Sequence, residues 1–337
     1  MIFDQLEFHN VEEIEDTKIG YRLHRFPRRV REKLGSVEDA TTYGRYIADL
    51  TTGCEIRFVT EGDRVLLSLS AFDEDGTVAI YRGDFKVGYR RIEAGKVNRI
   101  MLESPAGFDQ LNSAFKKGDF APDVWRIMSC HDFGLVYCGI ETFGQSVRPP
   151  KAEELPKKTL LAYGTSLTHG AAAQAYPVSY INYLARLLHV DLLNKGMGGS
   201  CMNECAVADY IAASDAWDVL YLENMTNMGE GMAKQYEEQT KYLLDKVCAA
   251  HPDKPVYAVT MFPIGMALDT GCDHPVKKRA FALDPILRRL AAEHPNVTVI
   301  EGDTILTDFR NLMTDLVHFN DFGHIRVAEN LAKVIRM

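Results

Sequence analysis

The second half of the chain alternates short apolar runs with stretches of helical periodicity. Between the runs, apolar residues recur every three or four positions, as at Ile181, Leu184 and Leu188. Strands that alternate with helices pair in parallel through right-handed crossovers. The pattern therefore predicts a three-layer α/β/α sandwich around a parallel five-stranded sheet. Its strands are expected at 159–163, 190–194, 219–223, 256–260 and 297–301.

The first 145 residues follow a different pattern, in which short strand-like runs are separated by turn residues and helical periodicity is weak. The runs at 65–70 and 78–81 flank Asp75-Gly76, a tight-turn signal, and are expected to form a hairpin. Many short strands at such spacings are typical of a β-sandwich. Further strands are expected at 85–89, 97–102, 125–128 and 135–140.

The segment 148–156 concentrates three prolines and four charged residues, as an exposed boundary between domains does. The chain of 337 residues is long enough for two domains with a core each. The expected division is a β-sandwich domain at 1–150 and an α/β domain at 151–337.

Charge and cysteine usage exclude several classes of function. The chain has 38 basic and 47 acidic residues and a net charge of -9, so it repels polyphosphate surfaces, and neither nucleic acid nor an anionic membrane is an expected partner. Seven scattered cysteines do not form a disulfide framework and indicate reduced thiols. With no signal-peptide pattern and no run of 18 apolar residues, a cytoplasmic location is expected.

Candidate chemistry lies in the loops that follow the predicted parallel strands, where open sheets of this kind bind their ligands. Ser166 follows the first strand in a turn bracketed by glycines. The second strand leads into a glycine-rich loop that contains Gly198 and Gly199, and the third leads to Asn227. Asp315 and His318 come after the last strand and before the final helical stretch.

These loops contain the parts of an acyl-transfer site. A serine hydroxyl attacks an ester only when an imidazole removes its proton, and a carboxylate fixes the tautomer of that imidazole. The three-residue spacing allows Asp315 to orient His318 toward Ser166. The oxyanion formed by the attack needs hydrogen-bond donors. The backbone N–H groups of Ser166 and Gly199 and the side-chain amide of Asn227 are the candidates.

Ser166, Gly199, Asn227 and His318 occur in the order and loop context of the four blocks of the SGNH (GDSL-like) hydrolase superfamily, and residues 158–337 resemble that superfamily. The resemblance implies a flavodoxin-like sheet with strand order 2-1-3-4-5, Ser166 as nucleophile and His318 as base. Together with the β-rich first half, the chain resembles two-domain members in which a jelly-roll-like module precedes the hydrolase. Several of those members act on acylated carbohydrates.

The sequence departs from the family blocks at several positions. Thr165 replaces the usual acidic residue before the nucleophile, and a change in loop packing is expected there. Met225 and Met228 replace residues of the third block, and Phe319 replaces the usual proline of the fourth. For the second block, family spacing favours Gly199 over Gly198.

For several other residues, a structural role is expected in place of a catalytic or binding role. His169 is expected at the pocket rim or in solvent, because a helix starting near Ser166 directs it away from the hydroxyl. His324 is expected to be solvated or capping. Trp125 could belong to a sugar platform, but strand aromatics more often pack in a core. Cysteines at 201–205 and at 272 lack the ligand spacing of a metal site.

The expected activity is that of a serine esterase that removes a short acyl group, such as acetyl, from a carbohydrate. It requires no metal and no organic cofactor, and its partner is a small-molecule or oligosaccharide ester. Two alternatives stay open. One is an acyltransferase or thioesterase with the same residues; the other is a carbohydrate-binding protein built on a degenerate hydrolase, suggested by Met225 and Met228. The oligomeric state is left open.

Overall fold

The computed structural model describes residues 1–35, 43–110, 118–228, 230–264 and 275–337. The chain forms two compact units. One comprises Met1–Arg28 and Ala48–Lys157, and the other comprises Arg29–Ile47 and Lys158–Met337. The division expected from the sequence fell between residues 150 and 151. Contacts instead divide the chain after Lys157, and they assign 29–47 to the second unit.

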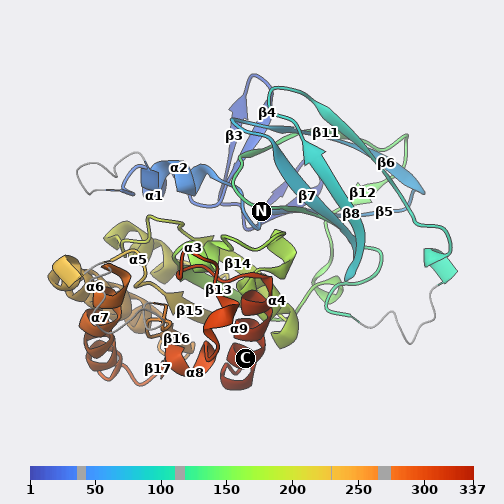
Figure 1. Cartoon of the computed structure of the whole chain (residues 1–337). Helices are drawn as coiled ribbons and strands as arrows, with labels where there is room; N and C mark the ends of the chain where they lie inside the picture. Colours follow the sequence, from blue (N-terminus) through green and yellow to red (C-terminus); the bar gives the residue numbers. More distant parts are fainter. Residues whose placement is uncertain (36–42, 111–117, 229, 265–274) are drawn as a thin grey trace. The chain divides into compact units, whose positions relative to one another are not determined.

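The first unit is built from antiparallel strands (Figure 1). They are β1 (Ile2–Phe3), β2 (Leu6–His9), β3 (Glu13–Thr17), β4 (Gly20–His24), β5 (Glu55–Thr60), β6 (Arg64–Ala71), β7 (Gly76–Arg82), β8 (Phe85–Ile92), β9 (Asn98–Glu103), β10 (Trp125–Ser129), β11 (Leu135–Glu141) and β12 (Val147–Arg148). One sheet has the order β1-β2-β5-β10-β7-β8, with β12 paired to β5, and the other has the order β3-β4-β11-β6-β9.

The two antiparallel sheets share one apolar core. Along β6, the fully buried residues Val65, Leu67 and Leu69 alternate with more accessible ones. They belong to the same buried cluster as Ile56 and Ile127 on the other sheet. Alternate residues of both sheets therefore fill the space between them, which confirms the predicted β-sandwich.

The predicted hairpin around Asp75-Gly76 is wrong. β6 pairs with β9 and β11, whereas β7 pairs with β8 and β10, so the two strands lie in different sheets. Their apolar residues face each other across the core and are not edge-to-edge neighbours. The turn signal was real, but it marks a connection between sheets.

Two short helices interrupt the strand-rich half, where only strands and turns were expected. They are α1 (Arg28–Arg31) and α2 (Tyr43–Asp49). Nearly all of this insertion packs with the second unit, although it precedes the rest of that unit by more than a hundred residues.

The sheet of the second unit has five parallel strands. They are β13 (Thr159–Gly164), β14 (Asp191–Gly196), β15 (Val219–Glu223), β16 (Val256–Val259) and β17 (Val297–Ile300). The spatial order is β14-β13-β15-β16-β17, which is the predicted 2-1-3-4-5 order. The three leading strands end at one level, because Gly164 is in register with both Gly196 and Glu223.

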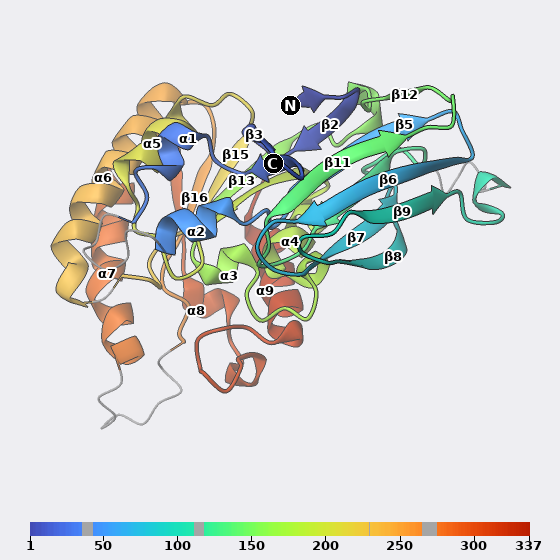
Figure 2. The same ribbon diagram turned by 90° about the horizontal axis from the view of Figure 1, so that it is seen from above.

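Helices cover both faces of this sheet. They are α3 (Ser166–His169), α4 (Tyr180–Leu188), α5 (Cys205–Ala212), α6 (Ala233–Ala250), α7 (Pro275–Ala291), α8 (Gly302–Ile305) and α9 (Asp321–Val334). Short 3₁₀ turns occur at Phe108–Gln110, Ala152–Glu154, Tyr176–Val178, Glu230–Met232 and Phe309–Asn311. α4 packs on α9, while α6 packs on both α5 and α7. Figures 1 and 2 show these two groups on opposite sides of the sheet, which confirms the three-layer arrangement.

Candidate active site

Ser166 lies at the first position of α3, directly after β13. Thr165 caps this one-turn helix by accepting the Leu167 N–H, and Gly170 ends it in a left-handed conformation with φ of 102°. The first N–H groups of a helix have no partner within the helix. The strand–turn–helix geometry therefore places the Ser166 hydroxyl and its own N–H together at the carboxyl end of the sheet.

The structure brings Ser166, His318 and Asp315 into one hydrogen-bonded series. Ser166 Oγ lies 2.8 Å from His318 Nε2, and His318 Nδ1 lies 2.7 Å from Asp315 Oδ2. The second carboxylate oxygen of Asp315 accepts the N–H groups of Val317 and His318 at 2.9 and 3.0 Å. The chain turns between Asp315 and His318, and Leu316 in this turn has a left-handed conformation with φ of 58°.

The Asp315 carboxylate remains charged in this setting. Partial burial raises its pKa, but the hydrogen bonds from the His318 ring and from two backbone N–H groups outweigh that effect and hold the pKa below 3.8. A negative charge beside Nδ1 keeps the proton on that nitrogen and leaves Nε2 facing the serine as an acceptor.

Two glycines follow β14, and their backbone contacts distinguish them. Gly198 N–H donates to His169 Nδ1 at 3.3 Å, so it is engaged within the protein. Gly199 has φ of 66°, and no described residue accepts its N–H. The loop lies beside the serine, because a methyl group placed on Gly198 would come within 3.7 Å of Ser166 Cα and Cβ.

Asn227 is linked to the same glycine-rich loop. Its Oδ1 accepts the Cys201 N–H at 3.1 Å, and this contact fixes which way the amide points. The Nδ2 group, which is the donor end, is left for another acceptor. The structure thus brings together the loops that carry all five predicted site residues.

Glu223 is a buried acidic residue that the sequence reasoning missed. It ends β15, and three threonine hydroxyls donate to its carboxylate: those of Thr165 at 2.8 and 3.0 Å, Thr168 at 3.1 Å and Thr226 at 3.1 Å. Burial raises its pKa from 4.5 to about 7, even though these hydroxyls favour the charged form. The signal was an acidic residue that ends an otherwise apolar strand.

Thr165 therefore takes part in loop packing, as its departure from the family pattern suggested. Besides the hydroxyl contacts, its backbone N–H donates to Glu223 Oε2 at 3.0 Å. The residue before Ser166 is held to the end of the third strand, and Thr226, the neighbour of Asn227, is held to the same carboxylate.

For two histidines, the alternative of solvent exposure is wrong. His169 is 3% exposed, so it does not face solvent; its Nδ1 accepts the Gly198 N–H and helps to hold the glycine-rich loop. His324 is fully buried, so it is not solvated; it accepts the Tyr180 N–H, the first of α4, at 3.1 Å, which is a capping contact, and its ring stacks on that of Tyr180. Both side chains are parts of the packed interior.

The remaining candidates are placed as follows. Trp125 is 1% exposed and packs in the sandwich core, so it offers no sugar platform. Cys201 is buried and Cys205 is exposed. Cys272 lies outside the described residues. Among the side chains that are described, no three His, Cys, Asp or Glu residues gather as a metal site requires.

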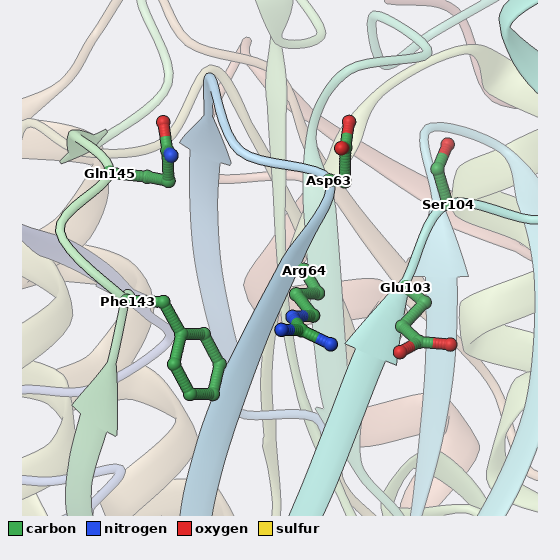
Figure 3. A pocket seen from close by; sticks show the side chains of 6 residues that line it. All are labelled: Asp63, Arg64, Glu103, Ser104, Phe143 and Gln145. Carbon is green, nitrogen blue, oxygen red and sulfur yellow. The ribbon is translucent and has the colours of Figure 1, made fainter.

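A separate hollow of about 610 Å³ lies in the β-sandwich and is lined by residues of that unit alone (Figure 3). Figure 3 shows Arg64 and Glu103 on adjacent strands, with the Phe143 ring nearby, and the guanidinium lies 5.2 Å from the centre of that ring. None of the five predicted site residues lines it.

Comparison with known proteins agrees with the second unit's geometry. The model of the GDSL-like Lipase/Acylhydrolase family matches residues 157–336, which include all five predicted site residues. The chain belongs to this family. Its enzyme class is accordingly that of the acylhydrolases, which cleave esters. No curated protein matches the chain in sequence.

Several solved structures share the fold of this GDSL-like acylhydrolase. The salicylyl-acyltransferase SsfX3 of a tetracycline biosynthetic pathway is 13% identical, with a TM-score of 0.76 over 97% of this chain and 93% of that one. A family two carbohydrate esterase from Clostridium thermocellum, in complex with cellohexaose, is 12% identical (TM-score 0.59; 84% and 91% covered). The acetyl xylan esterase Est2A of Butyrivibrio proteoclasticus is also 12% identical (TM-score 0.57; 83% and 88% covered).

At identities of 12–13%, the similarity to these structures shows a shared fold. It does not identify the substrate of this protein. Within the described residues, no helix combines the length and apolar character needed to cross a bilayer.

Proposed function

We propose that this protein is a serine esterase that hydrolyses short acyl esters of carbohydrates, with acetyl as the acyl group. The observation that carries the proposal is the 2.8 Å contact between Ser166 Oγ and His318 Nε2, with Asp315 on the other ring nitrogen. A nucleophile, a base and a group that orients the base are the minimum set for acyl transfer.

In the proposed reaction, Ser166 Oγ attacks the ester carbonyl carbon while His318 Nε2 takes the hydroxyl proton. The tetrahedral intermediate collapses when His318 returns that proton to the alcohol oxygen and the carbon–oxygen bond to the alcohol breaks. Water then attacks the acyl-serine, again with His318 as base, and releases the free acid and Ser166. Asp315 stays ionised and stabilises the imidazolium that forms in each half-reaction.

The proposed oxyanion donors are the N–H groups of Ser166 and Gly199 and the side-chain amide of Asn227. The engaged N–H of Gly198 supports Gly199 as the glycine donor, and the Cys201 contact supports an outward-facing Asn227 amide. Removing one such donor costs ~3–4 kcal/mol of transition-state stabilisation. This proposal requires no metal or organic cofactor.

The carbohydrate part of the proposal is supported by the fold neighbours, whose titles describe an acetyl xylan esterase and a carbohydrate esterase bound to cellohexaose. One neighbour supports a second candidate, because SsfX3 is an acyltransferase and matches the chain over nearly its full length. In that case an alcohol replaces water in the second half-reaction. The complete Ser–His–Asp set gives no support to a degenerate binding protein.

The test is turnover of p-nitrophenyl acetate and of acetylated xylo-oligosaccharides by the wild type, Ser166→Ala and Ser200→Ala. Ser200 is a second serine near the site and serves as the matched control. We expect Ser166→Ala to lose at least about 10³-fold in kcat and Ser200→Ala to keep most of its activity. Unchanged turnover in Ser166→Ala would refute the proposal. Faster formation of a transfer product than of free acetate, with xylobiose added as acceptor, would favour the acyltransferase.

A further inference from the structure

The α1–α2 insertion is anchored to the unit that carries the candidate active site. Val30 and Leu34 are buried, at 2% and 1% exposure, so the insertion contributes to a packed interior. The Gly35 N–H donates to Glu204 Oε1 at 3.2 Å, across 169 residues of sequence. A segment from the first half of the chain is therefore fixed beside the loop that follows β14.

Tyr43, the first residue of α2, lies against Gly199. A methyl group placed on Gly199 would come 2.8 Å from Tyr43 Cε1 and 3.5 Å from its hydroxyl oxygen. The tyrosine ring thus covers one face of the glycine that we propose as an oxyanion donor.

Tyr46 extends this aromatic surface. It follows Tyr43 by three positions on α2, which places both rings on one face of the helix. The ring centres are 6.2 Å apart and the planes are inclined by 31°. Tyr43 is 47% exposed and Tyr46 is 39% exposed, so neither side chain is buried in the protein core.

We propose that Tyr43 and Tyr46 form the binding site for the alcohol half of the ester, and that its occupant is a pyranose ring. This inference rests on the proposed function. The carbonyl oxygen points to the Gly199 N–H in the transition state, and the alcohol oxygen is bonded to the same carbon. A leaving group of one sugar ring therefore reaches an aromatic surface next to Gly199.

The chemistry of the two side chains suits a sugar. The apolar C–H face of a pyranose can lie on an exposed ring, and tyrosine hydroxyls at the rim can bond sugar hydroxyls, because tyrosine combines an apolar body with a polar tip. Ligand sites commonly combine aromatic walls with a few such polar groups.

The test compares two acetate esters that differ in the alcohol. Ethyl acetate has an alcohol too small to span the tyrosines, whereas a monoacetate of methyl β-D-xylopyranoside carries one pyranose ring. We expect Tyr43→Ala to lower kcat/KM for the sugar ester about tenfold, mainly through KM, and to leave ethyl acetate within about twofold. Tyr46→Ala should have a smaller effect in the same direction, and Tyr43→Phe should retain most of the activity.

Tyr89→Ala, which removes an exposed tyrosine from β8 in the other unit, is the matched control and should change neither substrate. Equal losses on both esters would overturn the inference, because Tyr43 would then only support Gly199. No loss on either ester would overturn it as well.

If the wild type hydrolyses neither ester, the proposed function fails, and the sugar site is tested on its own by ligand-observed NMR. Binding of methyl β-D-xylopyranoside to the wild type that Tyr43→Ala abolishes would support the site. Absent binding, or binding that Tyr43→Ala leaves unchanged, would overturn it.

Discussion

The hydroxyl of Thr165 donates to both carboxylate oxygens of Glu223, at 2.8 and 3.0 Å. This contact ties the residue before Ser166 to the end of the neighbouring strand β15. Thr226 donates to the same carboxylate, so one buried acid supports the loop of the proposed nucleophile and the loop of Asn227. An acidic group is thus present beneath the turn even though Thr165 replaces the usual acid in sequence.

Glu223 should make stability fall as the pH rises. Burial raises its pKa from 4.5 to about 7 in the folded protein. Below pH 4.5 the group is protonated in both states. Between pH 4.5 and 7 the unfolded chain releases the proton and the folded protein keeps it, so the free energy of unfolding decreases across this window, by about 3 kcal/mol at 1.36 kcal/mol per pKa unit.

Glu223→Gln removes that titration, and its unfolding free energy should depend less on pH between 4.5 and 7. Urea denaturation at several pH values measures the difference. The control is Glu153→Gln, an exposed position that should keep the wild-type slope. Parallel pH profiles for Glu223→Gln and the wild type would show that Glu223 does not titrate as described.

Asn227 should stabilise the transition state and should contribute little to substrate binding. Replacing it by Ala removes the amide donor and should reduce kcat about 10²- to 10³-fold with a small change in KM. Asn227→Asp is the sharper variant, because it keeps an oxygen for the Cys201 N–H but has no donor. Steady-state kinetics that show near-normal kcat for Asn227→Asp would remove Asn227 from the proposed oxyanion site.

Asp315→Asn should impair the reaction without unfolding the loop. The amide oxygen can still accept the N–H groups of Val317 and His318, but the side chain no longer holds a negative charge beside His318 Nδ1. We expect kcat to fall about 10²- to 10⁴-fold, while the melting temperature changes little. A variant with wild-type kcat would mean that His318 does not depend on Asp315 for its tautomer.

The pH dependence of the unfolding free energy provides a second test of Asp315. Hydrogen bonds from His318 and two backbone N–H groups hold the Asp315 pKa below 3.8, despite the opposing effect of burial. The stability that Asp315 contributes is therefore present above pH 3.8 and is lost as the pH falls through the lower folded-state value. Asp315→Asn should lack this acid-side loss in unfolding measurements.

The parallel sheet and the four loops could be predicted from sequence because fully buried strands leave a continuous apolar signature. The run at 219–223 coincides with β15, and the runs for β13, β16 and β17 each differ from the strand by one residue at one end. The run at 190–194 starts one residue before β14 starts and ends two residues before β14 ends. Parallel strands bring their carboxyl ends to one edge, so the loops that carry Ser166 and Asn227 could be expected at the same edge of the sheet.

Strand pairing in the sandwich could not be predicted in the same way. An alternating strand shows which face is buried, but it does not show which neighbour it pairs with. β6 and β7 were expected to form one hairpin because Asp75-Gly76 lies between them, yet they belong to different sheets. The α1–α2 insertion escaped notice because helices of four and seven residues leave little periodicity. Its position depends on contacts such as Gly35 with Glu204, which are remote in sequence.

The central claim, that Ser166 is the nucleophile and His318 its base, is tested most directly by covalent labelling. A fluorophosphonate probe should attach to the peptide that contains Ser166 in the wild type, as mass spectrometry of the digested protein would show. Labelling should be lost in Ser166→Ala and strongly slowed in His318→Ala. A folded wild-type protein that is not labelled, or one that is labelled at a different residue, would contradict the account.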